Sequence, residues 1–161
     1  MNNFKTKRFI KNKKIWFVDI PRTSSTSIRL FLCETLGKYY GKYNVFDEFK
    51  SRKSFYPDHL TTAECILFLG VKTWDKINKF TVVRNSWSRF YSVFGYLHTK
   101  KKIPSNLTFS DFILKAFKIF SNKDSKFDFS PKILIPQVSF LKKPDGLIDN
   151  SIKIIKFENR T

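Results

Sequence analysis

The sequence predicts an α/β fold, a three-layer sandwich in which a mostly parallel sheet lies between helices. Two observations support this fold class. Short apolar runs at 15–20, 79–83 and 151–157 have the composition of strands. Segments with the apolar spacing of helices separate these runs, in the order strand, helix, helix, strand, helix, helix, strand. Alternation of this kind is typical of parallel sheets whose crossover helices cover both faces.

In the first part of the chain, the strand Ile15–Ile20 ends at Pro21, and a helix is predicted over 25–36. Gly37 follows as the C-terminal stop of that helix. The segment 38–57 has weak periodicity, so we predict a long, partly ordered loop there. Loops of that length are often functional.

Two further helices begin with capping signals. Thr61 and Glu64 form the pattern of a capping box, which predicts a helix that ends at Gly70. The segment Thr108–Asp111 is a second start signal, for a helix that runs to about Phe120.

The helix expected after the strand at 79–83 carries a stripe of apolar residues. We predict that the stripe faces the core, and its members are Trp87, Phe90, Tyr91, Phe94 and Leu97. Pro144-Asp145-Gly146 indicates a turn before the last strand.

The chain has 161 residues and a net charge of +18, with 31 basic and 13 acidic residues. The length predicts one domain, placed over 15–161, and the basic composition of 1–14 predicts an N-terminal arm. The positive field would attract nucleotides, nucleic acid, acidic glycans or anionic membranes. AT-biased coding, which enriches Lys, Ile, Asn and Phe together, is an alternative source of the charge.

The two cysteines, Cys33 and Cys65, are far apart in the sequence, and no Cys/His spacing indicates zinc. The apolar run after the basic N-terminus is short and contains Asp19. It is therefore too short for a secretory signal or a membrane span. We expect a cytoplasmic protein with no transmembrane segment and no metal.

The segment Ile15–Arg29 joins a strand, a loop of hydroxyl residues and a helix start. Backbone N–H groups at a helix start have no intrahelical partners, and the helix dipole adds positive potential, so a phosphate can bind there. An ordinary capped strand-to-helix connection is the alternative. The Walker A pattern is missing, and 21–27 contains no glycine, which disfavours an ATPase or GTPase. Arg84 adds a cation at the end of the next strand, where open α/β sheets bind ligands.

Several segments resemble one enzyme family in the order in which they occur there. Ile20–Ile28 resembles the 5′-phosphosulfate-binding loop of sulfotransferases that use PAPS, 3′-phosphoadenosine 5′-phosphosulfate. Phe80–Ser92 resembles their 3′-phosphate motif, in which an Arg ends a strand and a Ser follows on the next helix. His59–Glu64 is similar to a third block of the carbohydrate branch, which includes the heparan and uronyl 2-O-sulfotransferases. The tail is similar too, at 137–141, 145–146 and 154–159.

The resemblance implies a P-loop-NTPase-like sulfotransferase fold, with PAPS as co-substrate and a carbohydrate hydroxyl as acceptor. Arg22 would lie against the leaving oxygen, and Arg84 with Ser92 would bind the 3′-phosphate. His59 would accept the proton of the acceptor hydroxyl. The backbone around the 5′-phosphate and the sulfuryl group would come from Thr23, Ser24, Ser25, Thr26 and Ser27. Such catalysis needs positioning and charge stabilisation rather than a metal.

The chain departs from the family pattern at three places. The family usually has Lys at position 22, and Arg22 keeps the charge but does not readily donate a proton. Many members have Gly near Ser24, where Ser fits if its φ is not positive. Members usually continue with further helices after the segment that ends here at Thr161, so we expect this domain to lack them.

Two other functions compete with the sulfotransferase. One is a weak or inactive protein of the same fold that binds a nucleotide or a glycan. The other, a basic nucleic-acid-binding protein, is disfavoured because no recognised module is present and the basic residues are spread along the chain. The acceptor is an acidic or already sulfated glycan if the charge is functional. We expect Trp87 and Phe90 in the core, His98 at the surface, and Arg89 either at the nucleotide or on a solvated face.

Overall fold

The computed structural model shows a mixed α/β protein and describes residues 9–10, 15–28, 31, 59–121 and 131–159. The chain divides into two compact units, one formed by 1–83 with 136–161 and the other by 84–135. The α/β class is confirmed, and the single domain over 15–161 stays a prediction. Among the described residues, no helix is long and apolar enough to cross a membrane.

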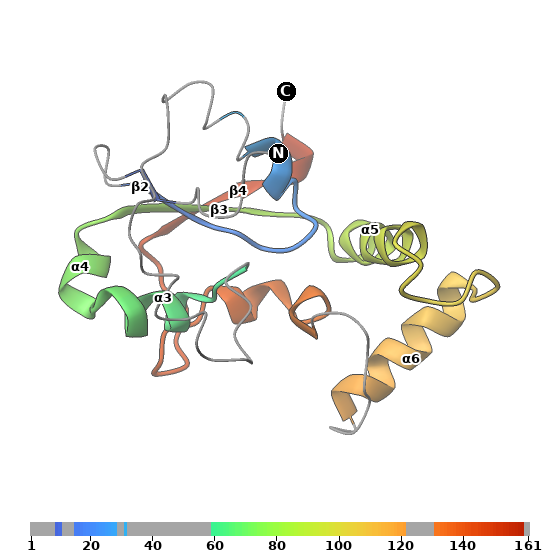
Figure 1. The fold of residues 1–161 in the computed structure, drawn as a ribbon. Helices are drawn as coiled ribbons and strands as arrows, with labels where there is room; N and C mark the ends of the chain where they lie inside the picture. Colours follow the sequence, from blue (N-terminus) through green and yellow to red (C-terminus); the bar gives the residue numbers. More distant parts are fainter. Residues whose placement is uncertain (1–8, 11–14, 29–30, 32–58, 122–130, 160–161) are drawn as a thin grey trace. The chain divides into compact units, whose positions relative to one another are not determined.

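The first unit contains one small sheet with the strand order β1-β2-β3-β4 (Figure 1). Its strands are β1 (Phe9–Ile10), β2 (Ile15–Val18), β3 (Asn78–Val83) and β4 (Ile152–Lys156). β2, β3 and β4 run parallel to one another, whereas β1 is antiparallel to β2. The carboxyl ends of β2 and β3 therefore lie at the same edge of the sheet. β1 belongs to the predicted N-terminal arm, of which 1–8 and 11–14 lie outside the described residues.

β2 ends at Val18, two residues before the predicted strand end at Ile20. Side-chain hydroxyl groups bond the carbonyl groups at this point: Thr81 Oγ1 donates to Val18 O at 2.8 Å, and Thr23 Oγ1 donates to Ile20 O at 2.9 Å. The bond from Thr23 is local, and local hydroxyl bonds of this kind compete with the strand ladder, whereas the bond from Thr81 comes from the neighbouring strand β3. The chain therefore leaves the sheet earlier than its apolar run suggests.

Both faces of the sheet carry buried aromatic residues, because neighbouring residues on a strand point to opposite faces. On one face, Phe17 stacks on Phe80 with 5.1 Å between ring centroids, and Ile28 packs against the same cluster. On the other face, Trp16 meets Trp74 edge to face at 6.1 Å. Helical residues thus contribute to the packing on both faces.

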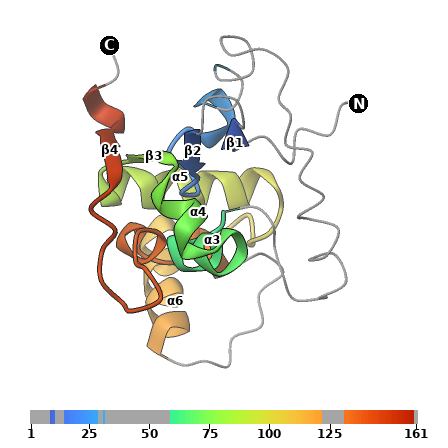
Figure 2. The same ribbon diagram turned by 90° about the vertical axis from the view of Figure 1, so that its left-hand side faces the viewer.

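The described residues of the first unit include the helices α3 (Thr62–Leu69) and α4 (Val71–Asp75) and the short 3-10 helices η4 (Gln137–Phe140) and η5 (Phe157–Asn159). α3 and α4 lie on one face of the sheet (Figures 1 and 2). The predicted capping box is confirmed, since Thr61 N donates to Glu64 Oε2 at 2.7 Å and Glu64 N donates to Thr61 Oγ1 at 3.2 Å. The predicted turn is confirmed by a bond of 3.0 Å from Gly146 N to Lys143 O.

Of the helix predicted over 25–36, residues 25–28 and 31 are helical. The remainder of that helix and the loop predicted over 38–57 lie outside the described residues. The first helical hydrogen bond runs from Ile28 N to Ser24 O at 3.0 Å.

The second unit contains α5 (Ser86–Thr99), α6 (Phe109–Ser121) and η3 (Pro131–Ile133). The core of this unit consists of Val93, Leu97, Ile103, Phe112, Ala116 and Leu134. The predicted stripe on α5 is wrong in part, because Trp87 is 70% exposed and Tyr91 is 63% exposed. The buried face of α5 is instead formed by Arg89, Val93 and Leu97.

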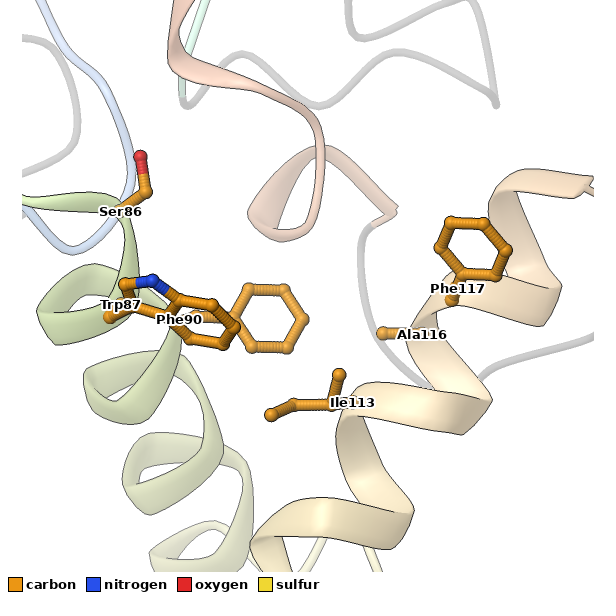
Figure 3. A pocket seen from close by; sticks show the side chains of 6 residues that line it. All are labelled: Ser86, Trp87, Phe90, Ile113, Ala116 and Phe117. Atoms are coloured by element: carbon orange, nitrogen blue, oxygen red, sulfur yellow. The ribbon is translucent and has the colours of Figure 1, made fainter.

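An apolar pocket of about 260 Å³ lies between α5 and α6 in this unit (Figure 3). It is lined by Ser86, Trp87, Phe90, Ile113, Ala116 and Phe117. The indole of Trp87 borders this pocket, and 70% of the residue is exposed. The prediction that Trp87 lies in the core is therefore wrong. Phe90 is half-buried and contacts Phe112 with 5.2 Å between ring centroids.

Candidate functional site

The loop after β2 has an unusual backbone. Arg22 has a φ of 65° and Ser24 a φ of 76°, so both residues lie in the left-handed region. For a residue with a side chain, this conformation costs about 1–2 kcal/mol of conformational free energy. Serine at position 24 was expected to fit if its φ is not positive, and the structure does not meet that condition. Strained residues of this kind concentrate at ligand-binding sites.

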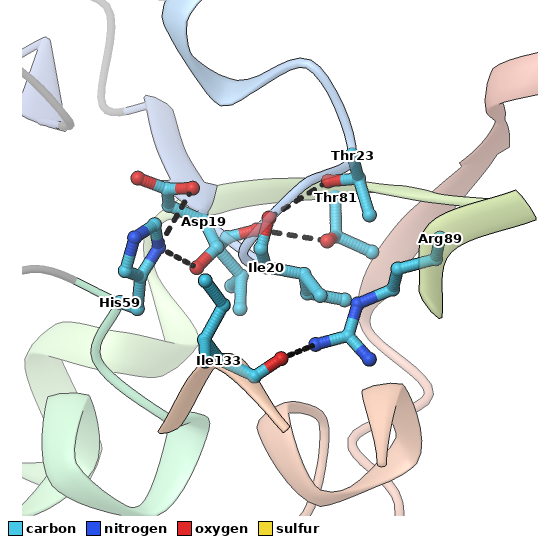
Figure 4. Close-up of polar contacts among 8 residues, drawn as sticks. Asp19, Ile20, Thr23, His59, Thr81, Arg89 and Ile133 are labelled. Carbon is cyan, nitrogen blue, oxygen red and sulfur yellow. Dashed lines mark hydrogen bonds and ion pairs between the residues drawn. The ribbon is translucent and has the colours of Figure 1, made fainter. Parts of the chain in front are cut away.

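The side chains of the loop divide into two groups. Thr23 is fully buried, and its hydroxyl group bonds Ile20 O within the loop (Figure 4). Ser25 is buried as well, whereas Thr26 and Ser27 are exposed at the start of the helix. Left-handed residues alternating with others turn successive backbone N–H groups toward a common side, a geometry that binds anions. The backbone is therefore the part of this loop that is best suited to hold a phosphate.

His59 contacts Asp19, a residue that the sequence did not single out as functional. His59 Nδ1 lies 3.1 Å from Asp19 O and 3.2 Å from Asp19 Oδ1 (Figure 4). The side chain of Asp19 is 0% exposed and that of His59 is 27% exposed. An acidic residue inside an apolar run was the available signal, because a buried carboxylate requires a partner.

The surrounding elements hold this pair in place. Asp19 directly follows β2, and His59 stands two positions before Thr61, the N-cap of α3. His59 itself has a φ of 65°. α3 is fixed in turn by a bond of 2.8 Å from Thr62 Oγ1 to Phe140 O, which joins segments far apart in the chain. Solvent reaches the imidazole, but the carboxylate is enclosed.

Arg84 directly follows the last residue of β3 and belongs to the second unit. Its Nε donates to Ser88 Oγ at 2.8 Å. Asn85 caps α5 by accepting from Trp87 N at 3.0 Å and from Ser88 N at 3.1 Å. The cap therefore places Ser88, and Ser88 orients the guanidinium. Sequence reasoning missed Ser88, although it stands four positions after Arg84.

The predicted site residues are divided between the two units. Arg22, the segment 23–27 and His59 belong to the first unit, and Arg84 and Ser92 belong to the second. Ser92 is half-buried on α5, one turn beyond Ser88. The structure brings His59 to Asp19 and Arg84 to Ser88, which are contacts within single units.

Arg89 does not lie on a solvated face. It is 4% exposed, and its Nη2 donates to Ile133 O at 2.9 Å (Figure 4). Burial lowers the pKa of Arg89 to about 10, which still leaves a cation at neutral pH. The other histidine, His98, is exposed as predicted, with Nε2 at 3.0 Å from Ser105 O.

Within the part of the chain that the structure describes, no group of three or more His, Cys, Asp or Glu residues could hold a metal ion.

Comparison with protein-family models, with curated proteins and with solved structures returned no match.

Proposed function

We propose that this protein is a sulfotransferase that moves a sulfuryl group from PAPS to a hydroxyl of a carbohydrate. The observation that carries the proposal is the left-handed backbone at Arg22 and Ser24, between a parallel strand and a helix. This loop coincides with the segment that resembles the 5′-phosphosulfate-binding loop. An anion-binding backbone in that segment is what such an enzyme needs.

The proposal includes a P-loop-NTPase-like fold with a three-layer core. Ile28, from the helix after the loop, packs on one face of the sheet, and Trp74 of α4 packs on the other. Packing on both faces supports a sheet between two layers of helices. The carboxyl edge of the parallel strands is where such folds bind their ligands.

At the 5′ end of PAPS, the backbone N–H groups of 23–27 would hold the phosphosulfate. Arg22 would lie near the oxygen that links phosphorus and sulfur, where negative charge develops as the S–O bond breaks. A fixed guanidinium stabilises that charge without donating a proton. Arg in place of the usual Lys therefore suits electrostatic stabilisation of the leaving group.

At the 3′ end, Arg84 and Ser92 would bind the 3′-phosphate. Ser88 orients the guanidinium of Arg84 through Nε, and a planar guanidinium has N–H donors in a fork that matches the oxygen atoms of a phosphate. Such charged hydrogen bonds are shorter and stronger than neutral ones.

The transfer itself needs a base at the acceptor. His59 would take the proton from the acceptor hydroxyl as its oxygen forms a bond to sulfur. The bond between sulfur and the phosphate oxygen breaks in the same step, and the 3′,5′-bisphosphate leaves as an anion. In this scheme, protein cations and backbone N–H groups stabilise the charge that develops, and no step is assigned to a metal.

Isothermal titration with PAPS and with its desulfated product tests the nucleotide site. We expect Arg84→Ala to weaken binding of both by at least ~1.5 kcal/mol, the lower range for a charged hydrogen bond. Lys100→Ala, which removes an exposed cation just after α5, is the matched control and should leave the affinity unchanged. Failure of both nucleotides to bind at moderate salt would overturn the proposal.

Transfer of labelled sulfate to a panel of neutral, acidic and partly sulfated glycans tests the reaction. Transfer to any member supports the enzyme and identifies its acceptor class. Nucleotide binding without transfer to any member favours the binding protein of the same fold instead.

A further inference from the structure

We infer that Asp19 is a positioning residue that fixes the tautomer of His59, so that Nε2 is the nitrogen that accepts a proton. The catalytic meaning of this inference rests on the proposed sulfotransferase function. The tautomer itself does not, because it follows from the contacts of the imidazole within the first unit.

His59 Nδ1 contacts two oxygen atoms of Asp19, the backbone carbonyl oxygen and one carboxylate oxygen. A backbone carbonyl oxygen can only accept a hydrogen bond, and so can an ionised carboxylate. Nδ1 must therefore carry the hydrogen, which it donates to Asp19 O, while Asp19 Oδ1 at 3.2 Å adds electrostatic attraction without hydrogen-bond geometry. In a neutral imidazole the lone pair then resides on Nε2.

The carbonyl contact makes this assignment independent of the charge on the carboxyl group. A protonated Asp19 could donate to Nδ1 and reverse the tautomer if the carboxyl group were the sole partner. The carbonyl oxygen of Asp19, at 3.1 Å from Nδ1, allows no such reversal because it has no hydrogen to donate. The side chain and the main chain of one residue thus favour the same tautomer.

The other histidine of the chain has the opposite arrangement, and the full sequence contains two histidines. His98 Nε2 lies 3.0 Å from Ser105 O, which requires the hydrogen on Nε2. The two imidazoles are therefore expected in opposite tautomers. His98 serves as an internal reference for His59 in the same sample.

In the proposed reaction, the hydroxyl of a sugar is a weak acid and needs a base to lose its proton. As His59 Nε2 takes that proton, the imidazole becomes a cation beside the buried carboxylate of Asp19. A carboxylate in this position stabilises the imidazolium and holds the ring in its productive orientation. Asp19 acts through His59 and has no direct contact with the substrate in this scheme.

The tautomers can be measured on the full chain labelled with ¹⁵N-histidine, by long-range ¹H–¹⁵N correlation at mildly alkaline pH, where ordinary imidazoles are neutral. We expect one Nδ1–H pattern and one Nε2–H pattern. His98→Gln should remove the Nε2–H pattern alone and so assign the other to His59. An Nε2–H pattern for His59, or the averaged pattern of a free imidazole, would overturn the inference.

The kinetic arm compares Asp19→Asn with the wild type. We expect kcat for sulfate transfer to fall by about 100-fold with KM for PAPS unchanged, because the variant keeps Asp19 O and the tautomer but loses the carboxylate that stabilises the imidazolium. An unchanged kcat in a folded Asp19→Asn variant would also overturn the positioning role. If Asp19→Asn does not fold, the NMR measurement on the wild type still tests which nitrogen of His59 carries the hydrogen. If the wild type transfers no sulfate but shows the Nδ1–H pattern, the proposed function fails and the tautomer assignment stands.

Discussion

Asp149 is held by donors on two sides in the first unit. Trp74 Nε1 donates to its Oδ2 at 2.7 Å, and Ser151 Oγ donates to its Oδ1 at 2.6 Å. Burial by itself raises the pKa of Asp149, but the bonds from Ser151 and Trp74, with the charge of Lys79, lower the pKa overall. The carboxylate is therefore better stabilised in the folded state than in the unfolded state.

A lowered folded-state pKa means that Asp149 stabilises the fold above the unfolded-state pKa of about 3.9. This contribution is lost as the pH falls through the folded-state pKa. We expect Asp149→Asn to lower the free energy of unfolding at neutral pH and to lose most of that effect in strong acid. Urea denaturation at both pH values measures the difference. An effect of equal size at both would show that the charge of Asp149 contributes nothing.

Ser88 orients Arg84, because its hydroxyl oxygen accepts a hydrogen bond from Arg84 Nε. We expect Ser88→Ala to weaken binding of the desulfated nucleotide by about 0.5–1.5 kcal/mol, the range for one hydrogen bond. The loss should be smaller than that of Arg84→Ala, since the charge remains. Ser110→Ala, at an exposed position of α6, is the control in the same titration. A loss equal to that of Arg84→Ala would mean that Ser88 contacts the ligand itself.

At the scale of elements, the loop between β2 and the helix starting at 25 depends on its backbone. Glycine can adopt a φ of 76° without steric cost, whereas a β-branched residue there is a genuine outlier. We expect Ser24→Gly to keep nucleotide binding and Ser24→Val to destabilise the fold by about 1–3 kcal/mol. Thermal unfolding and titration with the desulfated nucleotide separate the two effects. Loss of binding in a stable Ser24→Gly variant would instead assign the contact to the serine hydroxyl.

Most elements could be predicted from local patterns, because their signals lie within a few residues. The capping box at Thr61 and Glu64 predicted the start of α3, and the apolar runs predicted β3 and β4. The face of α5 could not be predicted in the same way. Its aromatic residues surround much of the helix, so hydrophobicity alone did not identify Val93 as core or Arg89 as buried.

The candidate site was predictable in its residue types and not in its contacts. The pair of Asp19 with His59 joins residues 40 positions apart, a separation that no local pattern reports. The left-handed backbone at Arg22 and Ser24 could not be predicted from the sequence either, since neither residue type favours a positive φ. Sequence reasoning identified His59 and Arg84 by resemblance, and the structure added the partners Asp19 and Ser88.

At the scale of the whole molecule, the net charge of +18 bears on the competing nucleic-acid function. A cation field of this size should bind duplex DNA at low salt through many phosphates at once. Such binding releases counterions, so the affinity should fall by about 10³-fold or more between 50 and 200 mM salt. The desulfated nucleotide displaces few ions, and its affinity should fall far less over the same range.

Arg84→Ala separates the two kinds of binding. It removes one of 31 basic residues, so DNA binding should hardly change, while nucleotide binding should lose at least ~1.5 kcal/mol. Fluorescence anisotropy with a labelled duplex and calorimetry with the nucleotide, both as a function of salt, provide the comparison. DNA binding that resists salt and weakens strongly in Arg84→Ala would contradict the nucleotide site. In that case the residue after β3 would recognise nucleic acid, and the charge of the chain would be functional rather than compositional.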